Sequence, residues 1–282
     1  MKIFTAIKDI QTEILKQKSL GKSIGFVPTM GFLHEGHLTL INKARQANDI
    51  VVLSIFVNPL QFGPNEDFST YPRDFERDSA LAESEEVDFL FYPSVEEMYP
   101  NEPSIKLIVQ KRTDVLCGKS RPGHFDGVVT VVSKLFHIIL PTRAYFGKKD
   151  AQQVAVIEGL ISDLNFPIEL IAVDIVREKD GLAKSSRNVY LLPEERQQAV
   201  VLYKSLNAAK AAIDQGERNS ARLMGMVHEM ITSESIGKID YVEILTYPRL
   251  KPLEKLEGRI IIALAVKFTR VRLIDNLIVD IN

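Results

Sequence analysis

Cysteine is nearly absent from this chain. Its 282 residues include one cysteine, Cys117. A single thiol forms no intrachain disulfide and supplies no cluster of thiolates for a structural zinc ion. Such a composition is typical of a protein in a reducing compartment, so we expect a cytoplasmic location.

Several other features are also missing. No apolar run reaches membrane-spanning length, residues 1–5 lack the apolar core of a signal peptide, and no internal repeat stands out. The formal net charge is only -2, which does not favour a nucleic-acid scaffold. We therefore expect neither nucleic acid nor a membrane as partner. The 45% hydrophobic and 26% charged fractions indicate a globular protein with one large or two modest domains.

The first two-thirds of the chain alternates between strand and helix patterns. Residues 50–57 form a nearly continuous apolar run, as in a strand buried on both faces of a parallel sheet. The alternation predicts an α/β fold with a Rossmann-like, doubly wound parallel sheet. The expected strands are 24–27, 50–57, 88–92, 143–146 and 168–176, and the expected helices are 34–48, 74–84, 126–140 and 151–164.

The pattern changes after residue 176. Two helical segments are followed by three closely spaced strands, which predicts a smaller C-terminal α+β domain. We expect a Rossmann-like domain at 1–176 that binds the substrates and a domain at 177–282 that closes over the site. The helices are expected at 193–215 and 220–235, and the strands at 240–246, 259–268 and 271–275.

Polar segments follow the predicted strands. Ligands of open α/β sheets bind beyond the carboxyl ends of the strands, where these segments converge. We therefore expect one ligand site there rather than four unrelated polar loops. The segments are 28–37, 58–63, 147–150 and 177–188.

The segment that runs from Phe26 to His37 is the most informative. A strand enters a Pro/Gly turn and then a helix whose first turn carries His34 and His37, with Gly36 allowing close approach. Helix N-termini attract anions, which suits a nucleoside triphosphate. The alternative is two ordinary capping or surface histidines. The zinc-protease pattern H-E-x-x-H has a different spacing.

The remaining motifs are weaker when taken singly. Asn58 and Gln61 suit a neutral or hydroxylated substrate, but an Asn-Pro turn explains them equally. In 147–150, the lysines are suited to binding phosphate. Asp150 is suited either to binding ribose hydroxyls or to capping a helix, and Gln153 lies one turn further on. The basic loop 181–188 suits phosphates or is a solvated linker.

Two further segments carry ambiguous signals. The turn 121–125, with Arg121 and His124, is either anion-binding or structural. Residues 113–120 imitate a P-loop but begin with Thr113 where that motif needs glycine. No G-x-G-x-x-G fingerprint is present, which disfavours a dinucleotide enzyme.

Taken together, these motifs resemble those of the pantothenate synthetase (pantoate–β-alanine ligase) family, in the HIGH-type nucleotidyltransferase superfamily. Seven of them occur in the family's order and approximate spacing. They are Pro28-Thr29-Met30-Gly31, His34-Glu35-Gly36-His37, Val57-Asn58-Pro59-Leu60-Gln61-Phe62-Gly63, Tyr71-Pro72-Arg73, Arg121-Pro122-Gly123-His124-Phe125, Phe146-Gly147-Lys148-Lys149-Asp150 and Ser185-Ser186-Arg187-Asn188.

The resemblance implies an ATP-dependent ligase of pantothenate and coenzyme A biosynthesis. It would condense (R)-pantoate with β-alanine through a pantoyl adenylate, with Mg²⁺, and release AMP and pyrophosphate. The resemblance also implies a homodimer. Such a reaction needs no side-chain nucleophile, which fits the position of Cys117 outside every motif.

The resemblance also implies site residues. The catalytic residues would be His37, His34 and Lys149. Gln61, Gln153 and Asn58 would bind pantoate or β-alanine, and Asp78 would be a magnesium ligand. Lys184 departs from the family, which often has a hydrophobic residue there, so it adds a phosphate contact or points to solvent. ATP would contact Met30, Gly31, Phe32, Leu33, His34, Glu35, Gly36, His37, Gly147, Lys148, Lys149, Asp150, Val176, Lys184, Ser185, Ser186 and Arg187.

Two other functions fit part of this pattern. A phosphopantetheine adenylyltransferase would share the histidine motif, but the amides of 58–63 and Gln153 suit hydroxyls better than an acceptor phosphate. A non-catalytic module would bind ATP without turnover. The combination of both histidines, Lys149 and the Ser-Ser-Arg segment favours the enzyme.

Overall fold

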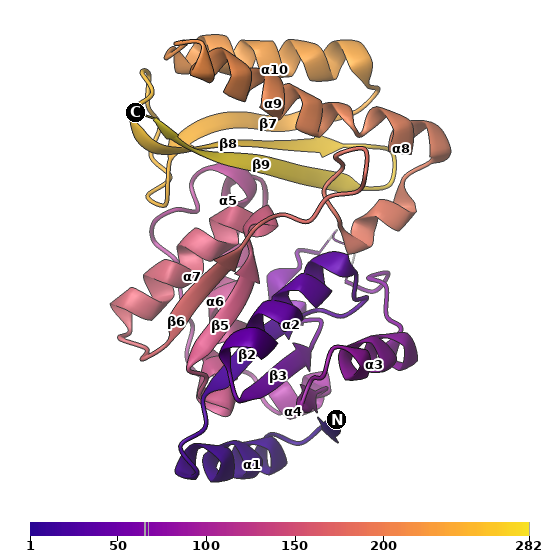
Figure 1. Ribbon diagram of the computed structural model, residues 1–282, viewed down its shortest axis with the longest axis vertical. Coiled ribbons are helices and arrows are strands. Elements are labelled where there is room, and N and C mark those ends of the chain that lie inside the picture. Colours follow the sequence, from indigo (N-terminus) through magenta and orange to yellow (C-terminus); the bar gives the residue numbers. More distant parts are fainter. Residues whose placement is uncertain (65, 67, 282) are drawn as a thin grey trace. The chain divides into compact units, whose positions relative to one another are not determined.

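The computed structural model describes residues 1–64, 66 and 68–281 (Figure 1). The chain forms two compact units, which are described separately. Unit 1 comprises Met1–Val109, Arg121–Lys148 and Val156–Asp174, and unit 2 comprises Gln110–Ser120, Lys149–Ala155 and Ile175–Asn282, whose last residue is outside the described part. None of the described helices combines the length and apolarity needed to span a bilayer.

Unit 1 is built on a six-stranded parallel sheet with the order β1-β4-β3-β2-β5-β6. This confirms the predicted α/β fold. The sequence order reverses between β2 and β5, and such a switch point is where doubly wound sheets bind ligands. The strands are β1 (Lys2–Phe4), β2 (Ile24–Thr29), β3 (Ile50–Ile55), β4 (Phe89–Phe91), β5 (Arg143–Gly147) and β6 (Glu169–Val173).

Helices cover the parallel sheet. α2 (Glu35–Ala47) packs against β2, β3 and β5, and α3 (Phe75–Ser84) lies beside α2. α1 (Ile7–Ser19) contacts α6 (His124–Ile139). The short α4 (Val95–Met98) follows β4. All six residues of β3 are buried, as its apolar run predicts.

Unit 2 contains a three-stranded antiparallel sheet of β7 (Lys238–Thr246), β8 (Gly258–Lys267) and β9 (Arg272–Ile281). Figure 1 shows α9 (Val201–Asp214) and α10 (Ser220–Glu234) together over one face of this sheet, where they contact β9 and β7. The short α5 (Leu116–Ser120) contacts β7 and β8, and α7 (Ala151–Asp163) begins in this unit.

Several elements differ from the sequence prediction. β1 and α1 were not predicted, because α1 buries only Ile10 and Ile14 among many polar residues. The helix expected at 193–215 is two, α8 (Pro193–Gln198) and α9. β9 continues beyond residue 275, where the predicted strand ends. Asp275 and Asn276 are polar and therefore look like a strand end in the sequence, but both are buried within the strand. The functional division at 176 remains a prediction, since compactness does not show what a domain binds.

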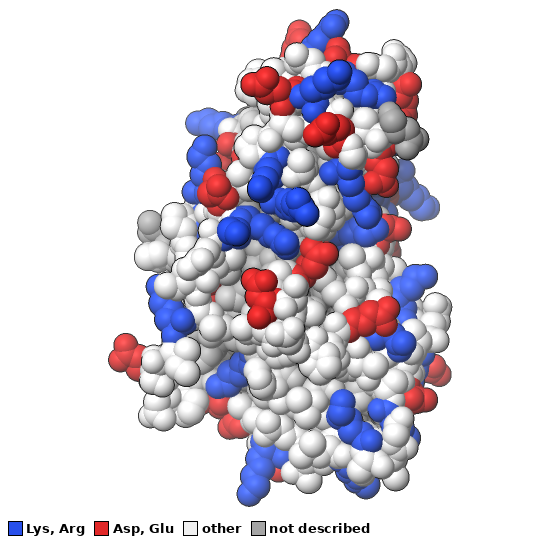
Figure 2. All heavy atoms as spheres, turned by 90° about the vertical axis from the view of Figure 1, so that its left-hand side faces the viewer, with Lys and Arg blue, Asp and Glu red and all other residues white. Residues whose placement is uncertain are grey.

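The surface carries charges of both signs. Figure 2 shows Lys and Arg side chains among Asp and Glu side chains on the face that it presents. This mixture agrees with the near-zero net charge of the chain.

Gly127 on α6 allows the loop after β3 to approach the helix. A Cβ at this position would overlap the backbone carbonyl of Leu60 and the nitrogen of Gln61. We expect Gly127→Ala to lower the free energy of unfolding by about 1–3 kcal/mol through this overlap. Gly225→Ala on α10 is the matched control, because no neighbouring atom lies within 4 Å of its Cβ. It should raise stability by about 0.5–1 kcal/mol. Urea unfolding measures the free energy of unfolding of both variants. A Gly127→Ala protein that is as stable as the Gly225→Ala control would contradict the prediction.

Candidate active site

The turn after β2 has a backbone that glycine makes possible. Gly31 has φ 83° and Phe32 has φ 50°, so both residues lie in the left-handed region. A Cβ on Gly31 would come within 2.9 Å of Ile55 Cγ2 and 3.0 Å of Asp78 Oδ2. Glycine therefore lets the chain turn sharply between β2 and α2 against the end of β3.

Asp78 on α3 holds this turn. One carboxylate oxygen accepts the backbone N–H of Phe32 at 2.6 Å, and the other accepts that of Leu33 at 2.7 Å. The side chain is almost completely buried. Burial raises the pKa of Asp78, although these two hydrogen bonds act in the opposite direction. The carboxylate thus fixes the chain immediately before the two histidines.

His34 is the N-cap of α2 rather than part of the helix. Its φ of -142° is extended, and its Nδ1 accepts the N–H of Gly36 at 3.1 Å. His37 Nδ1 accepts the N–H of His34 at 3.3 Å, which completes a capping box. The ring centroids are 4.0 Å apart. The sequence predicts both histidines in the first turn of the helix, whereas the structure brings the two imidazoles together through capping, with His34 just before the helix.

This capping selects a tautomer and explains Gly36. Because each Nδ1 accepts a backbone N–H, a neutral ring carries its proton on Nε2. A Cβ on Gly36 would lie 2.9 Å from His34 Cε1, so glycine makes room for the capping ring. The N-terminus of α2 consequently carries two imidazole N–H donors in addition to its backbone N–H groups.

The loop after β3 holds Gln61 through side chains. Asn58 Oδ1 accepts the N–H of Leu60 at 3.3 Å and the hydroxyl of Tyr99 at 2.9 Å. Asn58 Nδ2 donates to Gly127 O at 3.1 Å and to Gln61 Oε1 at 3.3 Å. Asn58 therefore builds the loop, as an Asn-Pro turn predicts, and its contact with substrate stays a prediction. Gln61 Nε2 in turn donates to Met30 Sδ at 3.0 Å.

The basic turn 121–125 braces the same loop. His124 Nδ1 and Gln61 O are 2.8 Å apart, and Arg121 donates to the same carbonyl at 3.2 Å. Arg121 also forms a two-point ion pair with Glu66, at 2.7 and 2.5 Å. Partial burial pushes the pKa of Glu66 upward, but the Arg121 hydrogen bonds and charge outweigh it, so the pKa is lowered. The structure thus gives this turn a structural role.

In unit 2, Lys149 and Asp150 end η2 (Lys148–Asp150), directly before α7. Lys149 Nζ lies 3.8 Å from Asp150 Oδ2. Gln153 on α7 is partly exposed, whereas the preceding Gln152 is buried and bonds the backbone of Arg112 and Val115. Lys148 belongs to unit 1, where its Nζ pairs with Asp174 at 2.6 Å.

The segment 176–187 of unit 2 contains a loop whose two ends are hydrogen-bonded to each other. The Val176 carbonyl accepts the N–H of Lys184 at 2.9 Å, and Arg177 bridges to Ala183. Ser185 caps η3 (Ser186–Tyr190) by accepting the N–H of Arg187. Lys184 Nζ pairs with Glu178 at 2.7 Å. The lysine that departs from the family pattern thus lies in an ion pair.

Asp78, the predicted magnesium ligand, already has a role in the turn. Both oxygens of Asp78 are bonded to backbone N–H groups. Across the described part of the chain, no three His, Cys, Asp or Glu side chains are grouped so as to hold a metal. The Asp78 carboxylate thus serves the turn, and its role as a magnesium ligand stays a prediction.

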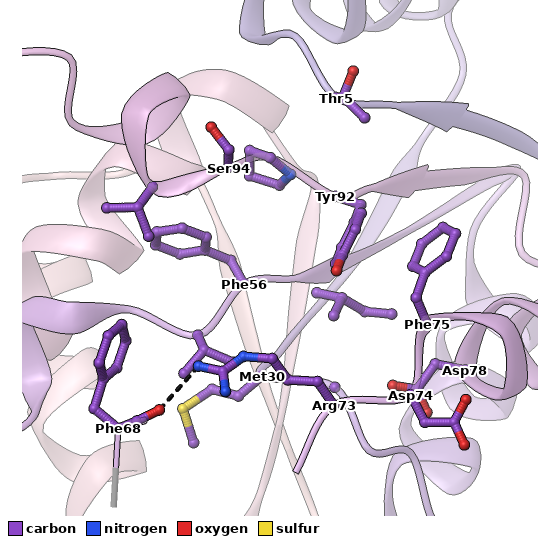
Figure 3. A pocket seen from close by; sticks show the side chains of 15 residues that line it. Thr5, Met30, Phe56, Phe68, Arg73, Asp74, Phe75, Asp78, Tyr92 and Ser94 are labelled. Atoms are coloured by element: carbon purple, nitrogen blue, oxygen red, sulfur yellow. Dashed lines mark hydrogen bonds between the residues drawn. The ribbon is translucent and has the colours of Figure 1, made fainter. Parts of the chain in front are cut away.

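A cavity of about 370 Å³ lies beside this turn, at the ends of β2, β3 and β4 (Figure 3). Met30, Gly31 and Asp78 line it, but the two histidines, Gln61 and Gly147 do not. Arg73 donates to the carbonyl of Phe68 across the cavity, as the dashed line in Figure 3 shows. Much of the remaining wall is apolar and includes Ile55, Phe56, Val57, Phe75, Tyr92 and Val95.

Unit 1 thus brings together one set of predicted residues, and unit 2 another. In unit 1, His34 contacts His37, and Gln61 contacts Met30. Lys149 and Ser185 line one small cavity of unit 2. The supporting side chains of Tyr99, Glu66 and Gln152 were not predicted, since nothing near them in the sequence indicates a distant partner.

Comparison with known proteins identifies the family. The family model described as Pantoate-beta-alanine ligase matches residues 2–278. The chain belongs to the pantoate-beta-alanine ligase family. It is a ligase that condenses pantoate and β-alanine with ATP. A pantothenate synthetase of Geobacillus sp. (strain WCH70) is 62% identical to it over 281 residues, which cover 100% of both chains.

Solved structures of ligases of this family have the same fold. The pantothenate synthetase of Thermus thermophilus is 45% identical, with a TM-score of 0.93 over 98% of this chain and 99% of that one. The pantoate-beta-alanine ligase of Francisella tularensis is 37% identical, with a TM-score of 0.79 over 98% of this chain and 97% of that one. The latter is described as complexed with beta-gamma ATP and beta-alanine.

The Asp78 contacts predict a specific stability effect. Asp78→Asn keeps the shape but turns one acceptor into an NH₂ donor that faces a backbone N–H. We expect it to lower the free energy of unfolding by about 1–3 kcal/mol, as measured by urea unfolding.

Asp74→Asn on the same helix is the matched control. Asp74 is the N-cap of α3 and accepts the N–H of Arg77 at 3.1 Å. Asparagine caps helices about as well as aspartate, so stability should change by less than about 0.5 kcal/mol. An Asp78→Asn protein as stable as this control would show that the turn does not depend on the carboxylate.

Proposed function

We propose that the ligase activates pantoate as a pantoyl adenylate and then transfers the pantoyl group to β-alanine. A pantoate carboxylate oxygen attacks the α-phosphorus of ATP while the bond to pyrophosphate breaks. The amine of β-alanine next attacks the acyl carbon, loses a proton, and AMP leaves. Neither step needs a side-chain nucleophile, and Cys117 is buried in contact with Tyr241 and Arg272.

One observation carries this proposal: two imidazoles stand at the N-terminus of α2, each with Nδ1 occupied by a backbone N–H. Their Nε2–H groups, with the helix terminus, are donors suited to the phosphate oxygens on which negative charge develops. We assign His37 and His34 this role. The predicted turn residues Met30, Gly31, Phe32, Leu33, Glu35 and Gly36 complete the unit 1 contribution to ATP binding.

The second group of anion-binding residues is assigned to unit 2. Lys149, Ser185, Ser186 and Arg187 supply charged and hydroxyl donors for the phosphates. Val176 supplies its backbone to adenine, and Asp150 contacts ribose. The ion pair of Lys184 with Glu178 favours a positioning role for that lysine over a phosphate contact.

Pantoate is assigned to Gln61 and Gln153, with Gln61 also near β-alanine. Gln61 is buried and its backbone is held by His124 and Arg121, so its amide has a defined position. Such fixed amides suit the hydroxyl and carboxylate groups of pantoate.

The proposal includes three further points that come from the family resemblance. Mg²⁺ would accompany ATP as the counterion of its phosphates. The ligase acts as a homodimer and in the cytoplasm.

A pyrophosphate-release assay tests the proposed reaction. With ATP and Mg²⁺ present, pantoate and β-alanine are omitted in turn. We expect sustained release only with both substrates, and AMP and pyrophosphate in equal amounts. Release that needs neither substrate, or ADP in place of AMP, would contradict the proposal.

His37→Ala tests the role of the imidazoles. Loss of one donor at the reacting phosphate should reduce pantoate-dependent pyrophosphate release by about 10²–10³-fold. His228→Ala is the control, because His228 is an exposed residue on α10 in unit 2. Circular dichroism checks that both variants fold. Near-normal turnover of a folded His37→Ala protein would remove His37 from the catalytic residues.

A further inference from the structure

Two adjacent polar residues lie buried in β9. Asp275 is 3% exposed and Asn276 is 5% exposed, in a sheet whose interior is otherwise largely apolar. Burying polar groups is unfavourable unless they are hydrogen-bonded. Because successive residues of a strand point to opposite faces, such a pair is able to reach two different segments.

Asp275 fixes the start of the loop that leads to Ser185. Its carboxylate accepts two hydrogen bonds from the Arg177 guanidinium, at 2.6 and 2.9 Å. Arg177 also donates to Gly181 O at 3.1 Å, and its guanidinium lies 3.6 Å from the ring centroid of Tyr203. Gly181, with φ 98°, has no room for a Cβ, which would meet Tyr203 Cδ1 at 2.6 Å. One ion pair thus holds both ends of 177–181.

Asn276 fixes the backbone that carries Lys149. Its Nδ2 donates to Lys149 O at 3.0 Å, and its own N–H donates to Asp275 Oδ1 at 2.8 Å. The two residues are thereby linked to each other as well as to their separate targets. Lys149, Ser185 and Asp275 also line one small cavity within unit 2.

Electrostatics supports the same arrangement. Burial raises the pKa of Asp275, and the hydrogen bonds and charge of Arg177 act against it, as does the charge of Lys149. The Asp275 carboxylate thus lies close enough to both cations for their charges to act on its pKa.

We propose that Asp275 and Asn276 are positioning residues that set Lys149 and Ser185–Arg187 at the separation needed to bind the ATP phosphates. The proposal rests on the phosphate role assigned to those residues above. Asp275 and Asn276 themselves act through Arg177 and through the Lys149 backbone.

The same sheet offers a matched ion pair. Asp240 on β7 accepts hydrogen bonds from Arg272 Nε and Nη2 at 2.9 and 2.7 Å, and from Ser120 Oγ at 2.9 Å. None of these partners belongs to the segments assigned to phosphate. Asp240→Asn therefore perturbs the sheet in a similar way without touching Lys149 or the loop.

The experiment compares Asn276→Ala with Asp240→Asn in the full-length protein. Calorimetry measures the binding of ATP and of adenosine, and urea unfolding measures stability. We expect Asn276→Ala to weaken ATP binding by about tenfold or more and adenosine binding by less than about threefold, because only ATP carries phosphates. Asp240→Asn should change both affinities by less than about threefold.

Equal effects of Asn276→Ala on ATP and adenosine, or effects matched by Asp240→Asn, would overturn the proposal. Should Asn276→Ala fail to fold, Asn276→Ser, which retains a donor, is measured in its place. We expect this variant to lose an intermediate amount of ATP affinity. An unchanged ATP affinity of Asn276→Ser would contradict the proposal. The binding data remain readable even if the wild-type protein releases no pyrophosphate, so failure of the proposed reaction is distinguished from failure of this inference.

Discussion

The contact between the Asp78 carboxylate and the backbone of Phe32 and Leu33 is the constraint on which the unit 1 site depends. It holds the left-handed turn at Gly31 and Phe32 closed, so α2 begins directly beyond the carboxyl end of β2. The capping box of His34 and His37 then fixes both rings by their Nδ1 atoms. A buried carboxylate is suited to this task, since its two oxygens accept two consecutive N–H groups of the turn.

Backbone carbonyls are the points through which several site segments are held. The carbonyl of Gln61 is contacted by Arg121 and His124. The carbonyl of Lys149 accepts a hydrogen bond from Asn276, and that of Gly181 accepts one from Arg177. Side chains of other segments thus determine where the backbone of these site segments lies. This arrangement suits a reaction that depends on positioned donors more than on a covalent step.

The sequence predicted the parallel sheet well, because an apolar run such as 50–57 indicates a strand buried on both faces. The sequence also placed the histidine turn, the 58–63 loop and the 147–150 segment at the ends of strands. It did not predict the residues that hold these segments. Asp78 lies 46 residues from Phe32, and Asn276 lies 127 residues from Lys149. Contacts between such distant positions leave no local periodicity, so Asp78 suggested a metal ligand and Asp275 suggested a strand end. The capping role of His34 was also hidden, because spacing alone does not distinguish an N-cap from the first helical turn.

Isotope transfer tests the central claim, that pantoate is activated by direct bond formation between its carboxylate and the α-phosphorus of ATP. Pantoate labelled with ¹⁸O in both carboxylate oxygens is converted completely in the presence of ATP and β-alanine. The masses of the products are then measured by mass spectrometry. The account predicts that one label appears in AMP and the other in the amide carbonyl of the product. AMP without label, or label in inorganic phosphate or pyrophosphate, would contradict it.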